Sequence, residues 1–251
     1  MKYYIFLLTS SFVFCQTQMK PEETEVWDPE PQKVNSGTIN SPPSDAIILF
    51  DGTDFSKWKS GIQNQPIMWT LNSDKSMTVK PGSGGIETIQ EHGSIQLHIE
   101  WKTPTIIKGK GQGRGNSGIF FQRRFEVQVL DSYQNRTYSN GQAGSIYKQH
   151  IPLVNASLPP GVWQTYDIVF NAPEYDELGE ETKAGRFTVF HNGILIQNSV
   201  EILGTVEFIG KPKKGLNAMP GSEKDQLTHR SLLLQDHGDL VSYRNIWIRK
   251  L

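Results

Sequence analysis

A short stretch in the middle of the chain combines an acid, an amide and guanidinium groups with an alternating apolar pattern. Within residues 114–132, apolar side chains occupy the odd positions of 124–129, whereas Arg124, Glu126 and Gln128 occupy the even ones. This period of two is typical of a strand that buries one face. The opposite face is either plain solvated surface or a row of side chains that binds hydroxyl groups, and the glycine-rich segment before it favours binding.

A second group of polar residues lies near the end of the chain, within residues 232–248. Gln235 and His237 share one face by their spacing, and Arg244 is expected beside them on the return strand of a hairpin. A neutral imidazole near a carboxylate and an arginine can transfer protons near neutral pH. The alternative for His237 is a turn histidine that is hydrogen-bonded to backbone. We expect this trio to meet the polar row on the central strand.

The composition predicts one β-rich domain. The chain has 251 residues, of which 36% are hydrophobic, with 23 Gly, 14 Pro and six Trp. This mixture suits short strands joined by turns, and the length suits a single all-β sandwich. The net charge is −1 and no long basic run occurs, so nucleic acid is not an expected partner.

The N-terminus has the pattern of an export signal. Residues 1–15 carry a lysine and then an apolar run too short to span a bilayer. Cleavage after Cys15 is favoured over lipid attachment to Cys15, because Phe14 is bulky where lipoprotein signals have a small residue. We expect a signal peptide at 1–15, a disordered linker at 16–46 and one β-sandwich domain at 47–251, exported to the periplasm or the cell surface, with no membrane span.

Turn signals divide the domain into strands. The clearest is a hairpin at 186–197, in which two apolar runs are joined by Asn192-Gly193. Asp51 and Asp54, which follow the first strand, are interpreted as turn residues, since two visible oxygens are too few for a calcium cage.

Several motifs, taken together and in order, resemble the 3-keto-disaccharide hydrolase domain family over about residues 46–251. They are Phe50-Asp51-Gly52 with Trp58, Asn116-Ser117-Gly118-Ile119-Phe120, Glu126-Val127-Gln128-Val129-Leu130-Asp131, Gly144-Ser145-Ile146-Tyr147, Trp163 with Tyr166-Asp167-Ile168, Asn192-Gly193, and Leu234-Gln235-Asp236-His237-Gly238 with Arg244-Asn245-Ile246-Trp247.

The resemblance implies a fold and a reaction. The fold is all-β, a two-sheet antiparallel jelly-roll sandwich of the concanavalin A type. The substrates are glycosides or disaccharides whose C3 hydroxyl a partner sugar 3-oxidoreductase has oxidised to a ketone. The ketone acidifies the C2 hydrogen, so that a base can remove it, the aglycone can leave from C1, and water addition gives a net hydrolysis.

The resemblance also suggests roles for nine residues. His237 or Glu126 is the expected base. The residues expected to stabilise the enolate oxygen are Arg244, with Arg123 or Lys148 as further candidates. The residues expected to hold substrate hydroxyls are Gln128, Gln235, Asn116 and Tyr147. A divalent metal ion held by His237 and Glu126 is the alternative to the arginine.

Two other functions compete with the enzyme. The same sandwich is widely used to bind sugars, so a non-catalytic carbohydrate-binding module is the main alternative. A structural envelope protein is the second alternative, but this function does not explain the row of polar side chains.

Overall fold

The computed structural model describes residues 19–38, 41–215 and 231–251. The chain divides into two units, residues 1–34 and 35–251. The described part of the first unit contains one 3₁₀ turn, Pro21–Thr24, and is exposed except at Val34, which is partly buried. The predicted signal peptide at 1–15 lies outside the described residues. Among the residues that are described, no helix is long and apolar enough to cross a bilayer.

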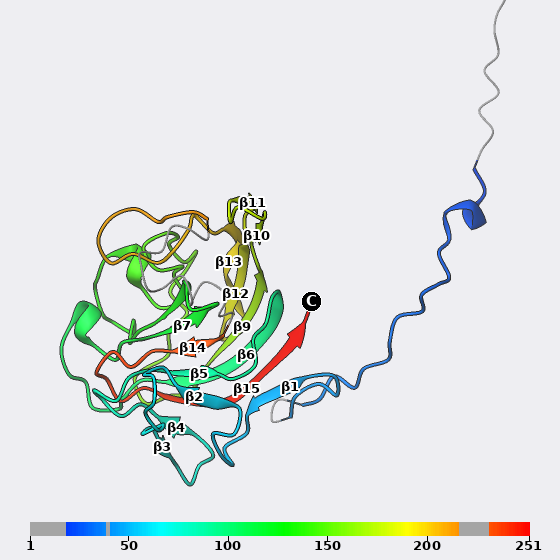
Figure 1. Cartoon of the computed structure of the whole chain (residues 1–251). Helices are drawn as coiled ribbons and strands as arrows, with labels where there is room; N and C mark the ends of the chain where they lie inside the picture. The colour runs from blue at the N-terminus through cyan, green and yellow to red at the C-terminus, as the bar shows by residue number, and fades with distance from the viewer. Residues whose placement is uncertain (1–18, 39–40, 216–230) are drawn as a thin grey trace, which may run out of the picture. The chain divides into compact units, whose positions relative to one another are not determined.

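The second unit contains two large antiparallel sheets (Figure 1). The larger has eight strands, in the order β13-β12-β9-β6-β15-β4-β3, with β1 also paired to β15. Its strands are β1 (Ile47–Phe50), β3 (Thr70–Leu71), β4 (Met77–Thr78), β6 (Ile95–Lys102), β9 (Gln164–Asn171), β12 (Arg186–His191), β13 (Ile194–Glu201) and β15 (Ser242–Lys250).

The smaller sheet has five strands, in the order β2-β5-β14-β7-β8. They are β2 (Trp58–Ser60), β5 (Ile86–Thr88), β14 (Leu233–Leu234), β7 (Ser117–Phe121) and β8 (Phe125–Val129). A separate hairpin joins β10 (Glu174–Tyr175) to β11 (Glu181–Lys183), and short 3₁₀ turns occur at Gly111–Gly113 and Ser139–Gly141.

The two sheets pack face to face and share one hydrophobic core. The ring of Phe121, on β7, lies 4.9 Å from that of Phe170 on β9 and 5.0 Å from that of Phe187 on β12. All three are almost fully buried. Aromatic contacts of this kind between alternating inward residues define a sandwich core, which confirms the predicted fold class.

Local turn chemistry is also as predicted. The hairpin between β12 and β13 turns at Asn192 and Gly193, whose φ angles are 52° and 78°. Positive φ at both central residues matches the twist of the flanking strands, and Asn and Gly adopt it most readily. The Asp51 carboxylate accepts hydrogen bonds from the backbone nitrogen and hydroxyl of Thr53, as expected of a turn residue.

The predicted C-terminal hairpin is wrong. β14 and β15 are separate strands as expected, but β14 pairs with β5 and β7 in the smaller sheet, whereas β15 pairs with β6, β4 and β1 in the larger one. The Asp-His-Gly-Asp segment is therefore a crossover between sheets. Arg244 on β15 is not a cross-strand neighbour of the residues around β14.

Candidate functional site

The central strand β8 carries the polar row as the sequence predicts. Val127 and Val129 face the core and are fully buried, while Glu126 and Gln128 point away from it. The outer face is not open surface, because Glu126 is only 5% exposed and Gln128 only 1%. Other segments cover the strand and leave a hollow above it.

That hollow is a pocket of about 230 Å³. We call it the Glu126 pocket. Its lining residues are Asn116, Phe120, Glu126, Gln128, Tyr147, Val206, Phe208, Gln235 and His237. Six of the nine residues selected from the sequence are among them.

Glu126 is the buried acid of this pocket. Burial raises the pKa of its carboxyl to about 8, because few polar groups replace the lost water. Its Oε1 lies directly above Gly118 on β7, where any Cβ atom would overlap the carboxyl and also come within 2.7 Å of the Phe120 ring. Glycine at position 118 therefore makes the space that the carboxyl occupies.

Amides surround the acid. The side-chain amide of Gln128 lies between Gln112 Oε1, at 2.9 Å, and Glu126 Oε1, at 3.0 Å. Gln235 is held through its backbone, since its carbonyl accepts a hydrogen bond from Ser117 Oγ and its nitrogen donates to Gly118 O. Its side-chain Oε1 is buried and has no hydrogen-bond partner among the described residues. The pocket thus presents amide groups that a ligand can pair with.

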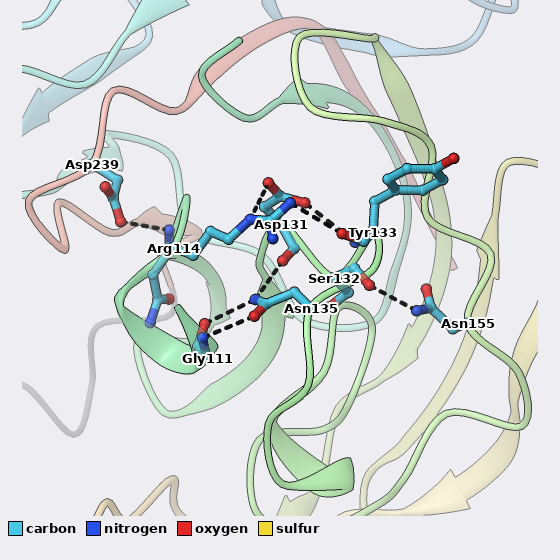
Figure 2. Close-up of polar contacts among 9 residues, drawn as sticks. Gly111, Arg114, Asp131, Ser132, Tyr133, Asn135, Asn155 and Asp239 are labelled. Carbon is cyan, nitrogen blue, oxygen red and sulfur yellow. Dashed lines mark hydrogen bonds and ion pairs between the residues drawn. The ribbon is translucent and has the colours of Figure 1, made fainter. Parts of the chain in front are cut away.

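His237 lies exposed at the edge of the pocket, on the crossover between β14 and β15. Asp236 fixes one side of this loop, because its carboxylate accepts from the backbone nitrogens of Gly84 and Gly238, both at 3.0 Å. Asp239 fixes the other side by accepting from the backbone nitrogen of Asn116 at 2.8 Å, and Figure 2 shows this carboxylate pointing to the chain beside Arg114. The loop is anchored at both ends.

Tyr147 lies in the lining of the Glu126 pocket, whereas Lys148 lies outside it. Tyr147 lines the pocket, and its hydroxyl lies 2.6 Å from that of Tyr138. Burial, and then this hydrogen bond, raise the pKa of Tyr147 above its usual value, so it is a neutral hydroxyl. Lys148 is outside the lining, where Nζ donates to the carbonyl of Phe208 and lies over the Tyr138 and Phe208 rings. Lys148 supports the wall that Phe208 forms.

The two arginines lie elsewhere. Arg123 is in the turn between β7 and β8 and pairs with Glu87 at 2.6 Å. Arg244 is on the larger sheet, where Nε donates to Glu100 Oε2 at 2.6 Å and the guanidinium lies 4.2 Å from the centre of the Trp163 ring. Neither residue lines the Glu126 pocket. The expected cluster of Arg244 with Gln235 and His237 does not form, because β14 and β15 belong to different sheets.

A metal site does not fit the described residues. No group of three His, Cys, Asp or Glu side chains that could hold a metal ion occurs in the ranges that the structure describes. Glu126 and His237, the pair expected from the sequence, supply two ligands, fewer than a protein zinc site has.

Three apolar residues of the lining are not among the candidate site residues selected from the sequence. Phe120 could have been placed by the alternation of β7, since it pairs with Glu126 across the sheet. Val206 and Phe208 come from a distant irregular segment, and only the fold brings them to β8: the nitrogen of Val206 donates to the Arg124 carbonyl at 2.9 Å.

The fold and this set of donors define a β-sandwich protein of the carbohydrate-active type. A family model described as the 3-keto-alpha-glucoside-1,2-lyase-like domain matches residues 45–249. The chain therefore belongs to this family, whose proteins are glycosyl hydrolase-like and lyase-like.

Solved structures agree with this assignment. The crystal structure of a provisionally assigned glycosyl hydrolase from Parabacteroides distasonis is 44% identical, with a TM-score of 0.83, and the match covers 93% of this chain and 97% of that one. Two further provisionally assigned glycosyl hydrolases of the same organism are 19% and 18% identical, with TM-scores of 0.53 and 0.52. Each match covers 82% of this chain, with 94% and 99% of the other chain, and shows the fold alone. No curated protein sequence matches the chain.

Proposed function

We propose that this protein is an exported enzyme that cleaves 3-keto-glycosides by elimination across C1 and C2. The observation that carries the proposal is the buried Glu126 carboxyl, whose pKa of about 8 places it close to neutrality in a pocket with amides and an imidazole. A general base works best when its pKa is near the working pH.

The chemistry follows from the ketone. A base removes the proton at C2, and the electron pair of that bond forms an enolate with the C3 carbonyl. The enolate then expels the aglycone oxygen from C1. A double bond forms between C1 and C2 of the sugar, and the leaving oxygen takes up a proton. Water can add across the double bond afterwards to give net hydrolysis. The ketone itself must come from a sugar 3-oxidoreductase.

The pocket offers a residue for each step. Ionised Glu126 is the base for C2, because it lies on the floor of the pocket. His237, at the exposed edge, donates the proton to the leaving oxygen. The side-chain amide nitrogen of Gln235 is the donor for the enolate oxygen, in place of the arginine expected from the sequence, and the Gln128 amide contacts the Glu126 carboxyl. Asn116 and Tyr147 border the remaining sugar hydroxyls.

The test is the turnover of methyl and 4-nitrophenyl 3-keto-glucosides by the purified protein. Glu126→Gln keeps the shape of the side chain but removes the base, and we expect kcat/KM to fall by about 10²- to 10⁴-fold. The matched control is Glu174→Gln, which alters an exposed ion pair with Lys183. EDTA should leave the rate unchanged.

Two outcomes would contradict the proposal. The first is a Glu126→Gln variant as active as the Glu174→Gln control. The second is absence of turnover with any 3-keto-glucoside together with binding of unoxidised sugar, which would favour the carbohydrate-binding module.

A further inference from the structure

A second and larger pocket, of about 490 Å³, lies beside the Glu126 pocket. We call it the Leu240 pocket. Its lining comes from the ends of β6 and β15 and from the loops next to them: Pro81, Lys102–Lys108, Arg114, Gly115, Asp131, Gly238–Leu240 and Ser242. None of the steps of the proposed mechanism involves this pocket.

The two pockets border the same ridge of backbone. Gly115 lines the Leu240 pocket and the next residue, Asn116, lines the Glu126 pocket. In the same way, Gly238 lines the Leu240 pocket and the residue before it, His237, lines the Glu126 pocket. Neighbouring residues are about 3.8 Å apart, so only one thickness of chain separates the two spaces at these positions. His237 therefore lies between the two pockets. An aglycone that leaves a sugar in the Glu126 pocket next to His237 is close to the Leu240 pocket.

The walls of the Leu240 pocket are largely apolar. They include Pro81, Pro104, Ile106, Ile107 and Leu240, and Ile106 and Leu240 are 74% and 52% exposed. Exposed aliphatic side chains around a concave site are typical of a surface that an apolar group covers.

Four of the five charged residues of this pocket already have partners, and the fifth, Lys108, is an exposed residue. Arg114 Nε donates to Asp131 at 2.7 Å and its Nη2 donates to the Tyr133 carbonyl, as Figure 2 shows. Lys102 lies 4.5 Å from the centre of the Trp163 ring, and Asp239 accepts from the Asn116 nitrogen. Groups that are paired in this way have less capacity to bind the hydroxyls of a second sugar.

The floor of the Leu240 pocket is closely packed and held by hydrogen bonds. Gly115 is tightly packed, because a Cβ there would lie 3.0 Å from Thr103 Cβ and 3.1 Å from Asp131 Cβ. Asn135 ties the same floor to the loop above it by bonding to both the nitrogen and the carbonyl of Gly111 (Figure 2). A preformed pocket lowers the cost of ordering a ligand.

We propose that the Leu240 pocket is the aglycone site and that it selects glycosides with an apolar alkyl or aryl aglycone. This inference rests on the proposed function, since the sugar ring must occupy the Glu126 pocket. The aglycone then passes His237, which protonates its oxygen, and its apolar body lies against Ile106, Ile107 and Leu240.

The test compares hexyl with methyl 3-keto-glucoside. Both leaving groups are simple alcohols of similar basicity, so the chemical step is matched and only the occupancy of the Leu240 pocket differs. We expect kcat/KM for the hexyl compound to be higher by about tenfold or more. Ile106→Ser and Leu240→Ser should each reduce the hexyl-to-methyl ratio by at least about threefold. Ile151→Ser is the control, because Ile151 is 60% exposed and outside the lining.

A binding measurement makes the result independent of turnover. Calorimetry with unoxidised hexyl and methyl glucosides and the Glu126→Gln variant should show the same preference for the hexyl group. Absence of turnover with both 3-keto compounds would contradict the proposed function, and the calorimetry would still decide on the aglycone site. A lack of hexyl preference in calorimetry, or a preference that survives both serine variants, would overturn the inference.

Discussion

The pKa of Glu126 is raised by the surroundings of its carboxyl group and not by a charged partner. Burial against Gly118 and Phe120 stabilises the neutral carboxyl and raises the pKa from the ordinary 4.5 to about 8. The protein therefore keeps a proton on this residue over a pH range in which an exposed glutamate is ionised.

The pKa of Glu126 predicts two opposite responses to pH. Activity requires the ionised base, so kcat/KM for a 4-nitrophenyl 3-keto-glucoside should rise with pH and level off above about 8. Stability should fall over the same range, because the folded state holds the proton more tightly than the unfolded state between pH 4.5 and about 8.

Denaturant unfolding at pH 5 and pH 8 measures the second response. The free energy of unfolding should fall by roughly 3 kcal/mol between these values, and Glu126→Gln should remove most of that change. The same pH dependence in the variant would show that other groups cause it.

The role of His237 can be separated from that of Glu126 by the leaving group. A nitrophenolate leaves without protonation, whereas an alkoxide needs an acid. His237→Ala should therefore reduce kcat/KM for methyl 3-keto-glucoside by about 10²-fold more than for the nitrophenyl compound. His150→Ala is the control, since the ring of His150 contacts the Glu201 carbonyl and does not line the Glu126 pocket. Equal losses on both substrates would mean that His237 is not the acid.

At the scale of the elements, strand β15 explains why Arg244 is absent from the Glu126 pocket. Its pairing with β6 shifts register between Arg244 and Trp247, and Asn245 has a φ of 48°. A bulge of this kind places two successive side chains on one face. Both Arg244 and Asn245 consequently donate to Glu100.

This contact gives Arg244 a structural role that can be tested. Burial opposes ionisation of Glu100, but the nearby His98 ring, at 4.0 Å, and hydrogen bonds from Asn245 and Arg244 outweigh it and lower the pKa to about 2. Arg244→Ala leaves the carboxylate with one donor fewer, and we expect a loss of about 2 kcal/mol in the free energy of unfolding. Turnover of folded protein should change by less than about twofold.

Lys183→Ala is the matched control, because it breaks the exposed pair with Glu174 and should cost less than about 0.5 kcal/mol. A large loss of kcat in Arg244→Ala with unchanged stability would show that Arg244 has a catalytic role instead.

At the scale of the whole molecule, the sequence predicts what depends on local pattern. The alternation through Glu126 and Gln128 correctly predicts a strand with a polar outer face, and Asn192-Gly193 predicts a hairpin, because side-chain period and turn geometry are properties of a few adjacent residues. The motifs that carry the family resemblance also contain seven of the nine residues that line the Glu126 pocket.

Local patterns in the sequence are therefore sufficient to predict the sandwich and most of the polar groups of its candidate site. They do not predict which segments cover that site or which strands pair. The crossover at His237 has the length of a hairpin loop, yet β15 pairs in the other sheet and takes Arg244 with it. Phe208 reaches the pocket from a distant loop, and the pKa of Glu126 rises because such segments exclude water from it. Long-range pairing and burial depend on the packing of the complete chain, and no short stretch of sequence encodes them.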